Sequence, residues 1–424
     1  MAGGARLGAS LVTTRQQTLR VGQPVWLRHA GRPKRQYPSL SSHHDTSVAI
    51  VGGGMTGALV AHAFASAGIS TVLLENAFVG RGSTGASSAL LLQEPDRELT
   101  ELVRRYGLRK GRRIWQMSQE SVHELVALLT RLRIACDLQL RDAVYYATDA
   151  EAVDRLHREW ALRTRTGFDA NWLSPAALHR LTGISGQGAI RTRGSAQFDP
   201  YRACLGILRA ASAAGAQVFE RSPVQRILVN DDHVRVHTRH GVVKADRVVI
   251  ATGYATPKFR PLAGRFRMYR TYVLATEPLS AAQRYRLGLS DIMVWDAERP
   301  YHYARWTRDH RLLLGGGDRL VRPRQRRGPM FAAATRELRA YFETQLPALT
   351  GVETPLAWEG LFAMTPDSLP YIGPHRRYPH HWFALGYGGN GMTFGFLAAR
   401  LLLERWQDRV SPDHALFEFG RMRR

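Results

Sequence analysis

The clearest pattern of hydrophobic and polar positions lies at residues 47–75, where a short apolar run precedes a cluster of glycines and a longer helical pattern. Residues 47–51 read SVAIV, which is typical of a parallel strand buried on both faces. Residues 52–57 read GGGMTG, residues 58–67 favour a helix, and residues 71–75 read TVLLE. The pattern predicts a strand, a glycine turn, a helix and a second strand.

The glycine turn has the spacing G-x-G-x-x-G, in which each glycine has a physical role. Gly52 permits a tight turn, Gly54 lets the backbone approach a pyrophosphate, and Gly57 lets the helix pack close to the strand. The helix N-terminus offers free N–H groups to phosphate, and Glu75 at the end of the second strand can accept ribose hydroxyls. A glycine-rich turn without a ligand is the alternative, but the strand, the helix and the acid all stand where a dinucleotide site needs them.

Two further stretches have small or hydroxylated side chains that can border a phosphate or a planar ligand. Residues 80–88 read GRGSTGASS and directly follow the second strand, so they indicate a cofactor contact, with a flexible loop as the alternative. Residues 386–391 read GYGGNG and precede a helix at 392–406. We expect this second helix N-terminus to point at the same ligand.

Helical periodicity dominates residues 98–181, which we interpret as an inserted cap domain. A strand is expected at 143–147, a capping box at Thr148 and Glu151, and a helix start at Ser174–Pro175. One buried stripe is expected to contain Ile114, Met117, Leu125, Leu128 and Leu132.

Strands and helices alternate over the rest of the chain. Asp199–Pro200 predicts the start of a helix that reaches Ala214, and residues 335–344 favour another helix. Residues 315–317 are three glycines that lack the rest of the dinucleotide fingerprint, and we interpret them as a turn. The expected strands are 217–219, 224–229, 234–237, 241–243, 247–253, 268–276, 301–306, 312–314 and 382–385.

Composition restricts the class of protein. The 424 residues are 44 % hydrophobic, which suits two interlocked globular domains. No apolar run has the length of a membrane span or of a signal peptide, so we expect a cytoplasmic protein. The formal net charge is +24, but the arginines are scattered and are dense only at 319–327, an expected loop. Nucleic acid is therefore not the expected partner.

Cysteine and histidine usage predicts no metal site. Cys136 and Cys204 lie far apart and form no metal-type spacing, which favours a reducing compartment. His43 and His44 are adjacent but have no partner cluster, so we interpret them as part of a solvated linker.

Taken together, these stretches resemble the D-amino-acid oxidase and glycine oxidase family of FAD-dependent oxidoreductases over about residues 46–406, with the greatest likeness to its γ-glutamylputrescine oxidase-like and sarcosine oxidase-like branch. The resemblance rests on the order of GGGMTG with Glu75, GRGSTGASS, VVIATG at 248–253, and TPDSLPYIG and GYGGNGMTF at 365–373 and 386–394. It implies an α/β fold in which an FAD-binding Rossmann-like domain of the glutathione-reductase type interlocks with an α+β substrate domain.

The resemblance also implies a discontinuous domain organisation. The expected FAD-binding domain comprises 46–97, 190–260 and 356–410, and the expected substrate or cap domain comprises 98–189 and 261–355. Residues 1–45 are expected to be a basic, partly disordered lead-in in which Trp26 could anchor the segment, and residues 411–424 a tail.

FAD is the cofactor that the resemblance implies. Relatives that attach flavin covalently use a histidine or a cysteine at positions that look like Ala86 and Gly360 here, so we expect non-covalent FAD. Sarcosine oxidase-like members carry a substrate-binding lysine where this chain has Thr393. The implied FAD contacts are Gly52, Gly54, Met55, Thr56, Gly57, Glu75, Gly82, Ser83, Thr84, Ser87, Ser88, Val224, Thr252, Gly253, Gly389, Asn390, Gly391, Met392 and Thr393.

The expected reaction is oxidation of a C–N bond in an amine or amino acid by hydride transfer to flavin N5, after which water hydrolyses the imine. No catalytic side chain is assigned, because the flavin carries the chemistry. Tyr272, Tyr303 and Arg305 are candidate substrate contacts, since arginine can clamp a carboxylate and tyrosine supplies a wall and a hydroxyl. Tyr303 and Arg305 could instead be ordinary exposed strand residues.

The electron acceptor and the oligomeric state stay open in the sequence. O2 or another acceptor would reoxidise the flavin, and a dehydrogenase that passes electrons to a quinone or a protein is one alternative. A flavoprotein that modifies a tRNA base is the other alternative, because the net charge is high.

Overall fold

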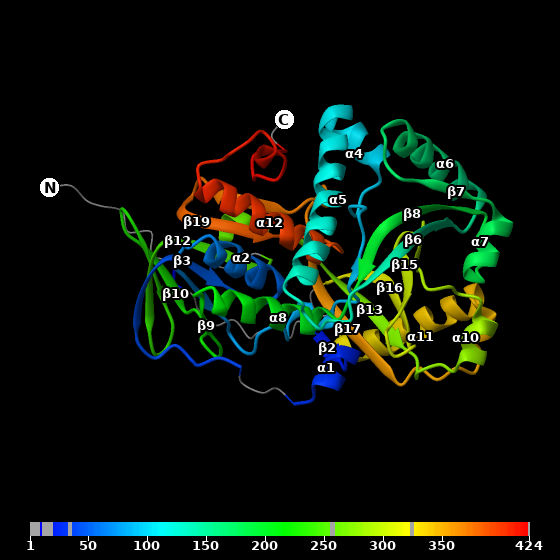
Figure 1. Cartoon of the computed structure of the whole chain (residues 1–424), viewed down its shortest axis with the longest axis horizontal. Coiled ribbons are helices and arrows are strands. Elements are labelled where there is room, and N and C mark those ends of the chain that lie inside the picture. Colours follow the sequence, from blue (N-terminus) through cyan, green and yellow to red (C-terminus); the bar gives the residue numbers. More distant parts are fainter. Residues whose placement is uncertain (1–8, 11–19, 33–35, 255–258, 323–325, 423–424) are drawn as a thin grey trace.

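The computed structural model of the chain describes residues 9–10, 20–32, 36–254, 259–322 and 326–422. Two sheets lie side by side within these residues and are covered by helices (Figure 1). The first sheet has nine strands among the described residues, and the second has ten. The chain passes between the two sheets several times, so neither sheet is formed by one continuous part of the sequence.

The first sheet is built around a parallel core. β12 (Val242–Gly253) pairs in parallel with β3 (His43–Val51), and β3 pairs in parallel with β4 (Thr71–Leu74). Its order is β1-β10-β11-β12-β3-β4-β9, with β19 also on β12 and β18 on β19. The remaining strands are β1 (Ala9–Ser10), β9 (Gln217–Phe219), β10 (Arg226–Val229), β11 (Val234–His237), β18 (Tyr371–His375) and β19 (Tyr378–Leu385).

The second sheet is mostly antiparallel and has the order β2-β17-β13-β16-β15-β14-β6-β8-β5, with β7 on β8. Only β14 and β6 are a parallel pair among its described strands. Its strands are β2 (Arg20–Gly22), β5 (Leu90–Leu91), β6 (Gln139–Ala147), β7 (Asn171–Leu173), β8 (Gly188–Gln197), β13 (Arg267–Ala275), β14 (Met293–Asp296), β15 (His302–Trp306), β16 (Leu312–Leu320) and β17 (Leu356–Met364).

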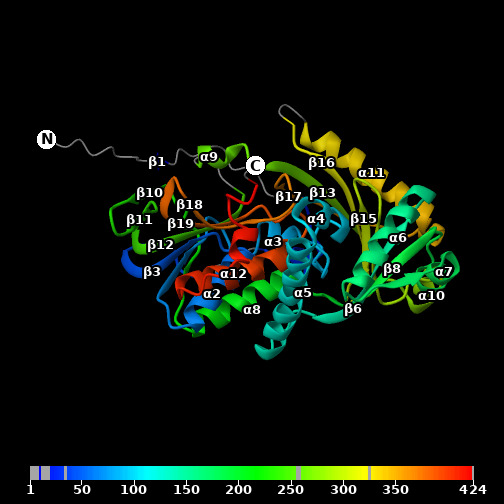
Figure 2. The same cartoon turned by 90° about the horizontal axis from the view of Figure 1, so that it is seen from above.

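Helices cover the sheets unequally. α2 (Met55–Ser66), α8 (Pro200–Ala213) and α12 (Gly391–Trp406) pack together on one side of the first sheet (Figure 2). α11 (Arg327–Gln345) and α10 (Ala281–Leu287) cover the second sheet. The other helices are α1 (Val25–Ala30), α3 (Ser83–Ala86), α4 (Leu99–Tyr106), α5 (Leu108–Arg131), α6 (Ala150–Arg165), α7 (Pro175–Thr182), α9 (Arg260–Ala263) and two short 3-10 turns at Pro347–Leu349 and His414–Leu416. Among the described residues no helix combines the length and the apolar character needed to cross a membrane.

The strand–turn–helix–strand unit predicted at residues 47–75 is confirmed as β3, α2 and β4. Parallel pairing joins Val48 to Thr71 and Val51 to Leu74, so the two apolar runs lie next to each other in the sheet. The predicted helix starts at Ser174–Pro175 and Asp199–Pro200 are also confirmed, because both cap side chains accept backbone N–H groups.

Two predictions about short segments are wrong. His43 and His44 do not belong to a linker, because they pair with Val242 and Val243 as the first residues of β3. Backbone hydrogen bonds, rather than apolar side chains, extend this strand. The glycines at 315–317 lie inside β16, since β13 and β15 pair with this strand on both sides.

The predicted capping box at Thr148 and Glu151 is also wrong. Asp149 is the N-cap of α6, and its carboxylate accepts the N–H of Ala152 at 2.8 Å. Thr148 instead donates its hydroxyl to Glu298. A shift of one residue decides the cap, because the residue with extended backbone geometry directly before the helix is the one that can reach its free N–H groups.

Parts of the lead-in and of the expected FAD-binding ranges join the second sheet. β2 pairs with β17, and Val25, Trp26 and Leu27 of α1 are buried, so the anchoring role of Trp26 is confirmed. β5, β8 and β17 lie in the second sheet, although the expected ranges group most of their residues with the FAD-binding domain. Residues 323–325 of the expected basic loop lie outside the described residues. At the two edges of that loop, Arg319 lies in β16 and Arg327 is the first residue of α11.

Candidate functional site

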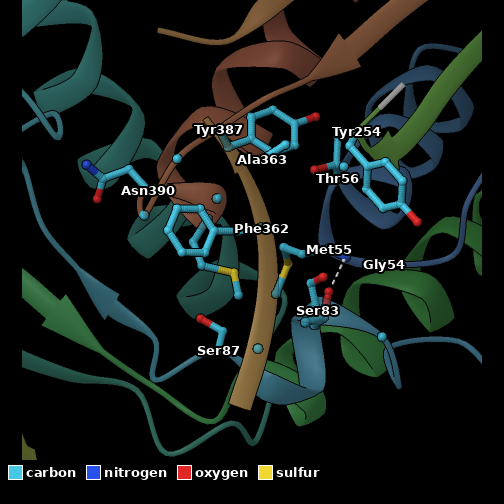
Figure 3. Close-up of a pocket in the computed structure, with 18 of the residues that line it drawn as sticks. Gly54, Met55, Thr56, Ser83, Ser87, Tyr254, Phe362, Ala363, Tyr387 and Asn390 are labelled. Atoms are coloured by element: carbon cyan, nitrogen blue, oxygen red, sulfur yellow. Dashed lines mark hydrogen bonds between the residues drawn. The ribbon is translucent and has the colours of Figure 1, made fainter. Parts of the chain in front are cut away.

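A cavity of about 1300 Å³ extends between the two sheets and is lined by residues from both. Pockets for drug-sized ligands occupy about 300–1,000 Å³, so this cavity has room for a dinucleotide and a small second molecule. Figure 3 shows Gly54, Met55 and Ser83 close together in one part of the cavity and Asn390 in another.

Most of the predicted cofactor contacts line this one cavity. Gly57 and Thr393 do not, because each lies inside a helix beyond its first residues. The lining contacts are Gly52, Gly54, Met55, Thr56, Glu75, Gly82, Ser83, Thr84, Ser87, Ser88, Val224, Thr252, Gly253, Gly389, Asn390, Gly391 and Met392.

The start of α2 makes an anion-binding surface at the cavity. Gly54 is the N-cap and has no side chain to satisfy the first N–H groups of the helix, of which that of Met55 donates to Thr84 Oγ1 at 2.9 Å. The other N–H groups of the first turn and the positive end of the helix dipole remain for a phosphate. Gly57 lets the helix come this close, since a Cβ there would lie 1.9 Å from the carbonyl oxygen of Gly52.

Glu75 lies at the carboxyl end of β4, beside this helix start. Its Oε2 accepts the N–H of Gly53 at 2.7 Å, and its Oε1 accepts the N–H of Ala77 at 2.8 Å. Burial raises the pKa of its carboxyl group above the usual range, against these hydrogen bonds. Each carboxylate oxygen can accept a further hydrogen bond, so Glu75 can also receive two hydroxyls from a sugar.

α12 brings a second helix N-terminus to the same cavity. Gly389, Asn390, Gly391 and Met392 line it, and the N-cap residue Asn390 directs its side-chain amide to the carbonyl of Glu94 at 3.0 Å. Two helix starts thus face one cavity, which the prediction that both point at the same ligand requires.

The second sheet and its loops supply an aromatic and charged compartment of the same cavity. Tyr145 and Trp295 stack there with ring centroids 5.1 Å apart. Tyr303, a predicted substrate contact, does line the cavity, and burial raises the pKa of its hydroxyl to about 12. The charged and aromatic residues of this compartment are Glu94, Asp96, Arg97, Glu98, Tyr145, Arg163, Trp295, Arg299, Tyr301 and Tyr303.

The structure does not support the predicted substrate clamp at Arg305. Its side chain is buried and donates to the backbone carbonyls of Ser88 at 2.6 Å and Phe198 at 3.0 Å. The guanidinium also stacks on the ring of Trp26 at 5.0 Å, and burial lowers its pKa to about 9. Arg305 is outside the cavity lining and holds the hydroxyl-rich segment in place.

The structure likewise does not support a substrate contact at Tyr272. Its neighbour Thr271 lines the cavity, and successive side chains of a strand point to opposite faces, so Tyr272 faces the core under α11. There it packs against Phe331, with ring centroids 6.4 Å apart.

Arg299 is an arginine of the cavity that the sequence did not indicate as a candidate substrate contact. It lines the cavity, its side chain is half exposed, and its nearest carboxylate oxygen, on Glu98, is 4.0 Å away. By contrast, Arg163 is buried and engaged by Glu94 and Glu159. Arg299 and Asp96 lie in irregular segments without hydrophobic periodicity, so no sequence signal marks them.

Metal binding has no support in the described part of the chain, which contains no group of three or more His, Cys, Asp or Glu side chains that could hold an ion. Cys136 and Cys204 are both free and buried.

Comparison with known proteins agrees with this geometry. The family model described as FAD dependent oxidoreductase (DAO) matches residues 47–405. The chain is 28 % identical to gamma-glutamylputrescine oxidoreductase of Escherichia coli (strain K12), over 87 % of this chain and 85 % of that protein. It is 25 % identical to glycine oxidase of Bacillus licheniformis, over 83 % of this chain and 90 % of that protein.

Solved structures show the same fold. Glycine oxidase from Geobacillus kaustophilus aligns with a TM-score of 0.77 at 21 % identity. The alignment covers 90 % of this chain and 100 % of the glycine oxidase chain. L-proline dehydrogenase from P. horikoshii aligns with a TM-score of 0.74 at 21 % identity, over 90 % of this chain and 97 % of its own. Since the family match covers most of the sequence, the chain belongs to the DAO family of FAD-dependent oxidoreductases.

Proposed function

We propose that the chain oxidises the C–N bond of a small amine or amino acid with non-covalently bound FAD. The observation that carries the proposal is the continuity of the cavity. One space joins the helix start at Gly54 and the carboxylate of Glu75 to the compartment of Arg299, Tyr301 and Tyr303. A dinucleotide that binds at the first end can therefore meet a small molecule at the second.

The residues of the first end fit FAD. The amides at the start of α2 and the hydroxyls of Ser83 and Thr84 would hold the pyrophosphate, and Glu75 the ribose. Val224 would contact the adenine, and the start of α12 would approach the flavin ring, where its dipole favours negative charge. When bound, FAD supplies the acceptor of the hydride that leaves the substrate carbon.

The second end would bind and orient the substrate. Arg299 donates through Nη1 to the carbonyl of Glu298 at 3.2 Å, and its guanidinium, which carries five N–H donors, can also bind a carboxylate. Tyr303 and the stacked pair of Tyr145 and Trp295 would exclude water and pack against the substrate. These side chains position a substrate, and none of them needs to act as a nucleophile.

Non-covalent attachment is supported by the cavity wall. Ala86 and Gly360 occupy the positions where relatives attach flavin, and the described lining residues include neither histidine nor cysteine. Acid precipitation should therefore leave the flavin in the supernatant. Flavin that stayed on the protein pellet would contradict this part of the proposal.

The central experiment is anaerobic addition of amines and amino acids to the purified flavoprotein. We expect the flavin absorbance to bleach with at least one of them, whereas a panel without any effect would refute the proposal. Peroxide formation in air would then distinguish an oxidase from a dehydrogenase that uses a quinone or a protein acceptor.

A tRNA-modifying role is not favoured, because the relatives named above are amine and amino-acid oxidoreductases by name. A cytoplasmic location remains a prediction that rests on the two free, buried cysteines, and cell fractionation would test it.

A further inference from the structure

Asp96 is held at the meeting point of the two ends of the cavity. It comes from the segment between β5 and α4 and lines the cavity. Its Oδ2 accepts the N–H of Gly389 at 2.6 Å, and its Oδ1 accepts the side-chain amide of Asn390 at 2.9 Å. The carboxylate therefore has a fixed place beside the start of α12, where the proposed flavin ring and substrate would meet.

Tyr301 reaches the same place from a different part of the chain. A Cβ at position 389 would lie 2.6 Å from the hydroxyl of Tyr301 and 3.0 Å from Oδ1 of Asp96. Only a glycine leaves room for both side chains here. Segments around residues 96, 301 and 389 thus converge on one point in the cavity wall, with an acid and a hydroxyl together.

Charged groups surround this carboxylate unevenly. Arg97 from its own segment and Arg299 from the loop before β15 favour its ionised form, as does the N–H of Gly389. Burial opposes them and raises the pKa of Asp96 to about 6. Asp318 of β16 is a further carboxyl nearby, and burial and the charge of Asp96 raise its pKa to about 7. Asp96 is therefore ionised at neutral pH and binds a proton more readily than an exposed aspartate.

We propose that Asp96 accepts the proton that a substrate ammonium must lose before oxidation, and that the Tyr301 hydroxyl positions the amine beside it. This role rests on the proposed amine oxidation. An ammonium has no lone pair on nitrogen, so its carbon cannot release a hydride. Transfer of one N–H proton to the carboxylate gives a neutral amine and a carboxylic acid. The nitrogen lone pair then forms the C=N bond as the hydride leaves the carbon for FAD, water hydrolyses the iminium, and Asp96 returns its proton to solvent.

The pH dependence of flavin bleaching tests this role. In the wild type, the second-order rate constant of anaerobic flavin reduction should fall as the pH falls through about 6, because protonated Asp96 in the free enzyme cannot accept a proton. In Asp96→Asn, the rate near neutral pH should drop by about 100-fold or more, which is the usual contribution of a general base. The remaining rate should rise about tenfold per pH unit, because only the amine that is already neutral in solution reacts.

Infrared spectroscopy gives a readout that does not depend on turnover. Binding of a non-oxidisable amine to the wild-type holoenzyme should produce the band of a protonated carboxyl group, which Asp96→Asn should lack. The melting temperature and the bound flavin of the variant should stay close to the wild type, since Asn can still accept one backbone N–H. An Asp96→Asn protein that lost its flavin and its rate equally at every pH would have lost a support of the turn at 388–390, and the role would be refuted.

Glu98→Gln is the matched control. Glu98 also lines the cavity, but its Oε1 is engaged by the hydroxyl of Tyr145 at 2.7 Å. The fall in rate near pH 6 should persist in Glu98→Gln and disappear in Asp96→Asn, and the reverse would overturn the assignment. If an amine bleaches the flavin of the wild type but Asp96→Asn keeps the wild-type pH profile of the rate, only the proposed role of Asp96 is refuted. If no amine bleaches the wild type, the proposed function falls with it.

Discussion

The two ends of the cavity are built in different ways. At the cofactor end, backbone groups make most of the surface: the amides at the start of α2, the turn at 52–54 and the small residues at 82–88. At the substrate end, long side chains such as Tyr145, Trp295 and Arg299 make the surface. Backbone sites depend on close approach between elements, whereas side-chain sites depend on partners that hold each group.

This difference predicts different consequences of mutation. A change that adds a single carbon group should be most damaging at the cofactor end, where helix and strand already touch. At the substrate end, the removal of one charged partner should matter more, because buried charges there stabilise one another in pairs.

Among the variants, Gly57→Val should cause the largest loss of stability and of bound flavin. A Cβ at this position would lie 1.9 Å from the carbonyl oxygen of Gly52, so α2 must move away from the strand that carries the glycine turn. Overpacking of a close contact costs about 1–3 kcal/mol and more where backbone must shift, and we expect more than about 3 kcal/mol here. The flavin content of the purified variant and its thermal unfolding would measure the loss.

Gly328→Ala is the control for this substitution. Gly328 lies in the first turn of α11, and no atom lies within 4 Å of a Cβ added there. This variant should retain its flavin and melt at or above the wild-type temperature, because alanine favours a helix. Flavin retained in full by Gly57→Val would show that the cofactor end tolerates the extra group. The contrast between a cofactor end that depends on close backbone approach and a substrate end that depends on side chains would then be wrong.

Arg163→Met should have the next largest effect, at the substrate end. Arg163 donates to Glu159 at 2.8 Å and to Glu94 at 3.2 Å, and all three side chains are buried. Glu159 also accepts the N–H groups of Leu99 and Thr100 at the start of α4. Loss of the arginine leaves these carboxylates without a positive partner, which costs about 3–5 kcal/mol. Urea unfolding monitored by tryptophan fluorescence would measure it.

Two variants accompany Arg163→Met. Arg158→Met lies on an exposed position of the same helix, α6, and should change stability little. The double variant Arg163→Met with Glu159→Gln should recover part of the loss, since it removes one of the unpaired charges. A double variant no more stable than the single one would show that shape rather than charge explains the cost.

The same contrast explains how much the sequence could predict. GGGMTG and Glu75 mark the cofactor end because a tight turn, a close approach and a helix start each require a particular residue type at a fixed spacing. Seventeen of the residues that the family resemblance assigned to FAD line the cavity, among them Gly52, Gly54 and Glu75 of this motif. Residues 48–51 of β3 and 71–74 of β4 were also predictable, since these runs are largely apolar and mostly buried.

The substrate end could not be predicted in the same way. Its residues come from irregular segments, and only the tertiary structure brings Asp96 and Tyr301 to Gly389. Strand position alone did not separate Tyr303, which faces the cavity, from Arg305, which points the same way but ends among backbone carbonyls. No sequence pattern indicated that the tail, residues 411–424, contacts the rest of the protein. In the structure, Arg421 binds Asp367, which lies 54 residues earlier in the chain.

Arg421→Met tests that tail contact. Arg421 donates to both carboxylate oxygens of Asp367, at 2.7 and 2.9 Å, and both side chains are buried. Although burial opposes it, the hydrogen bonds from Arg421 lower the pKa of Asp367 to about 2, below about 3.9 in an unfolded chain. The pair therefore stabilises the fold above about pH 4 by about 2–3 kcal/mol, and this contribution is lost as the pH falls towards 2.

The measurement is the free energy of unfolding of the wild type and of Arg421→Met from pH 7 downward. The difference between them should be largest at neutral pH and should narrow below pH 4, because the wild type then loses the same ion pair. A difference that stayed constant down to pH 2 would indicate lost packing on Tyr371, over which Arg421 stacks at 4.1 Å.

Arg299 and Arg305 give the smallest and most direct test of the comparison, because one lines the cavity and the other does not. Titration of the holoenzyme with a small carboxylate such as acetate, followed by the change in flavin absorbance, gives a dissociation constant without any turnover. Arg299→Ala should weaken this binding by about tenfold or more, the effect of losing a charge-assisted hydrogen bond of about 1.5–3 kcal/mol. Arg305→Met should mainly lower the melting temperature, because the carbonyls of Ser88 and Phe198 lose their donor inside the protein. Weaker acetate binding in Arg305→Met with an unchanged Arg299→Ala would reverse the assignment and return the substrate clamp to the arginine that the sequence first indicated.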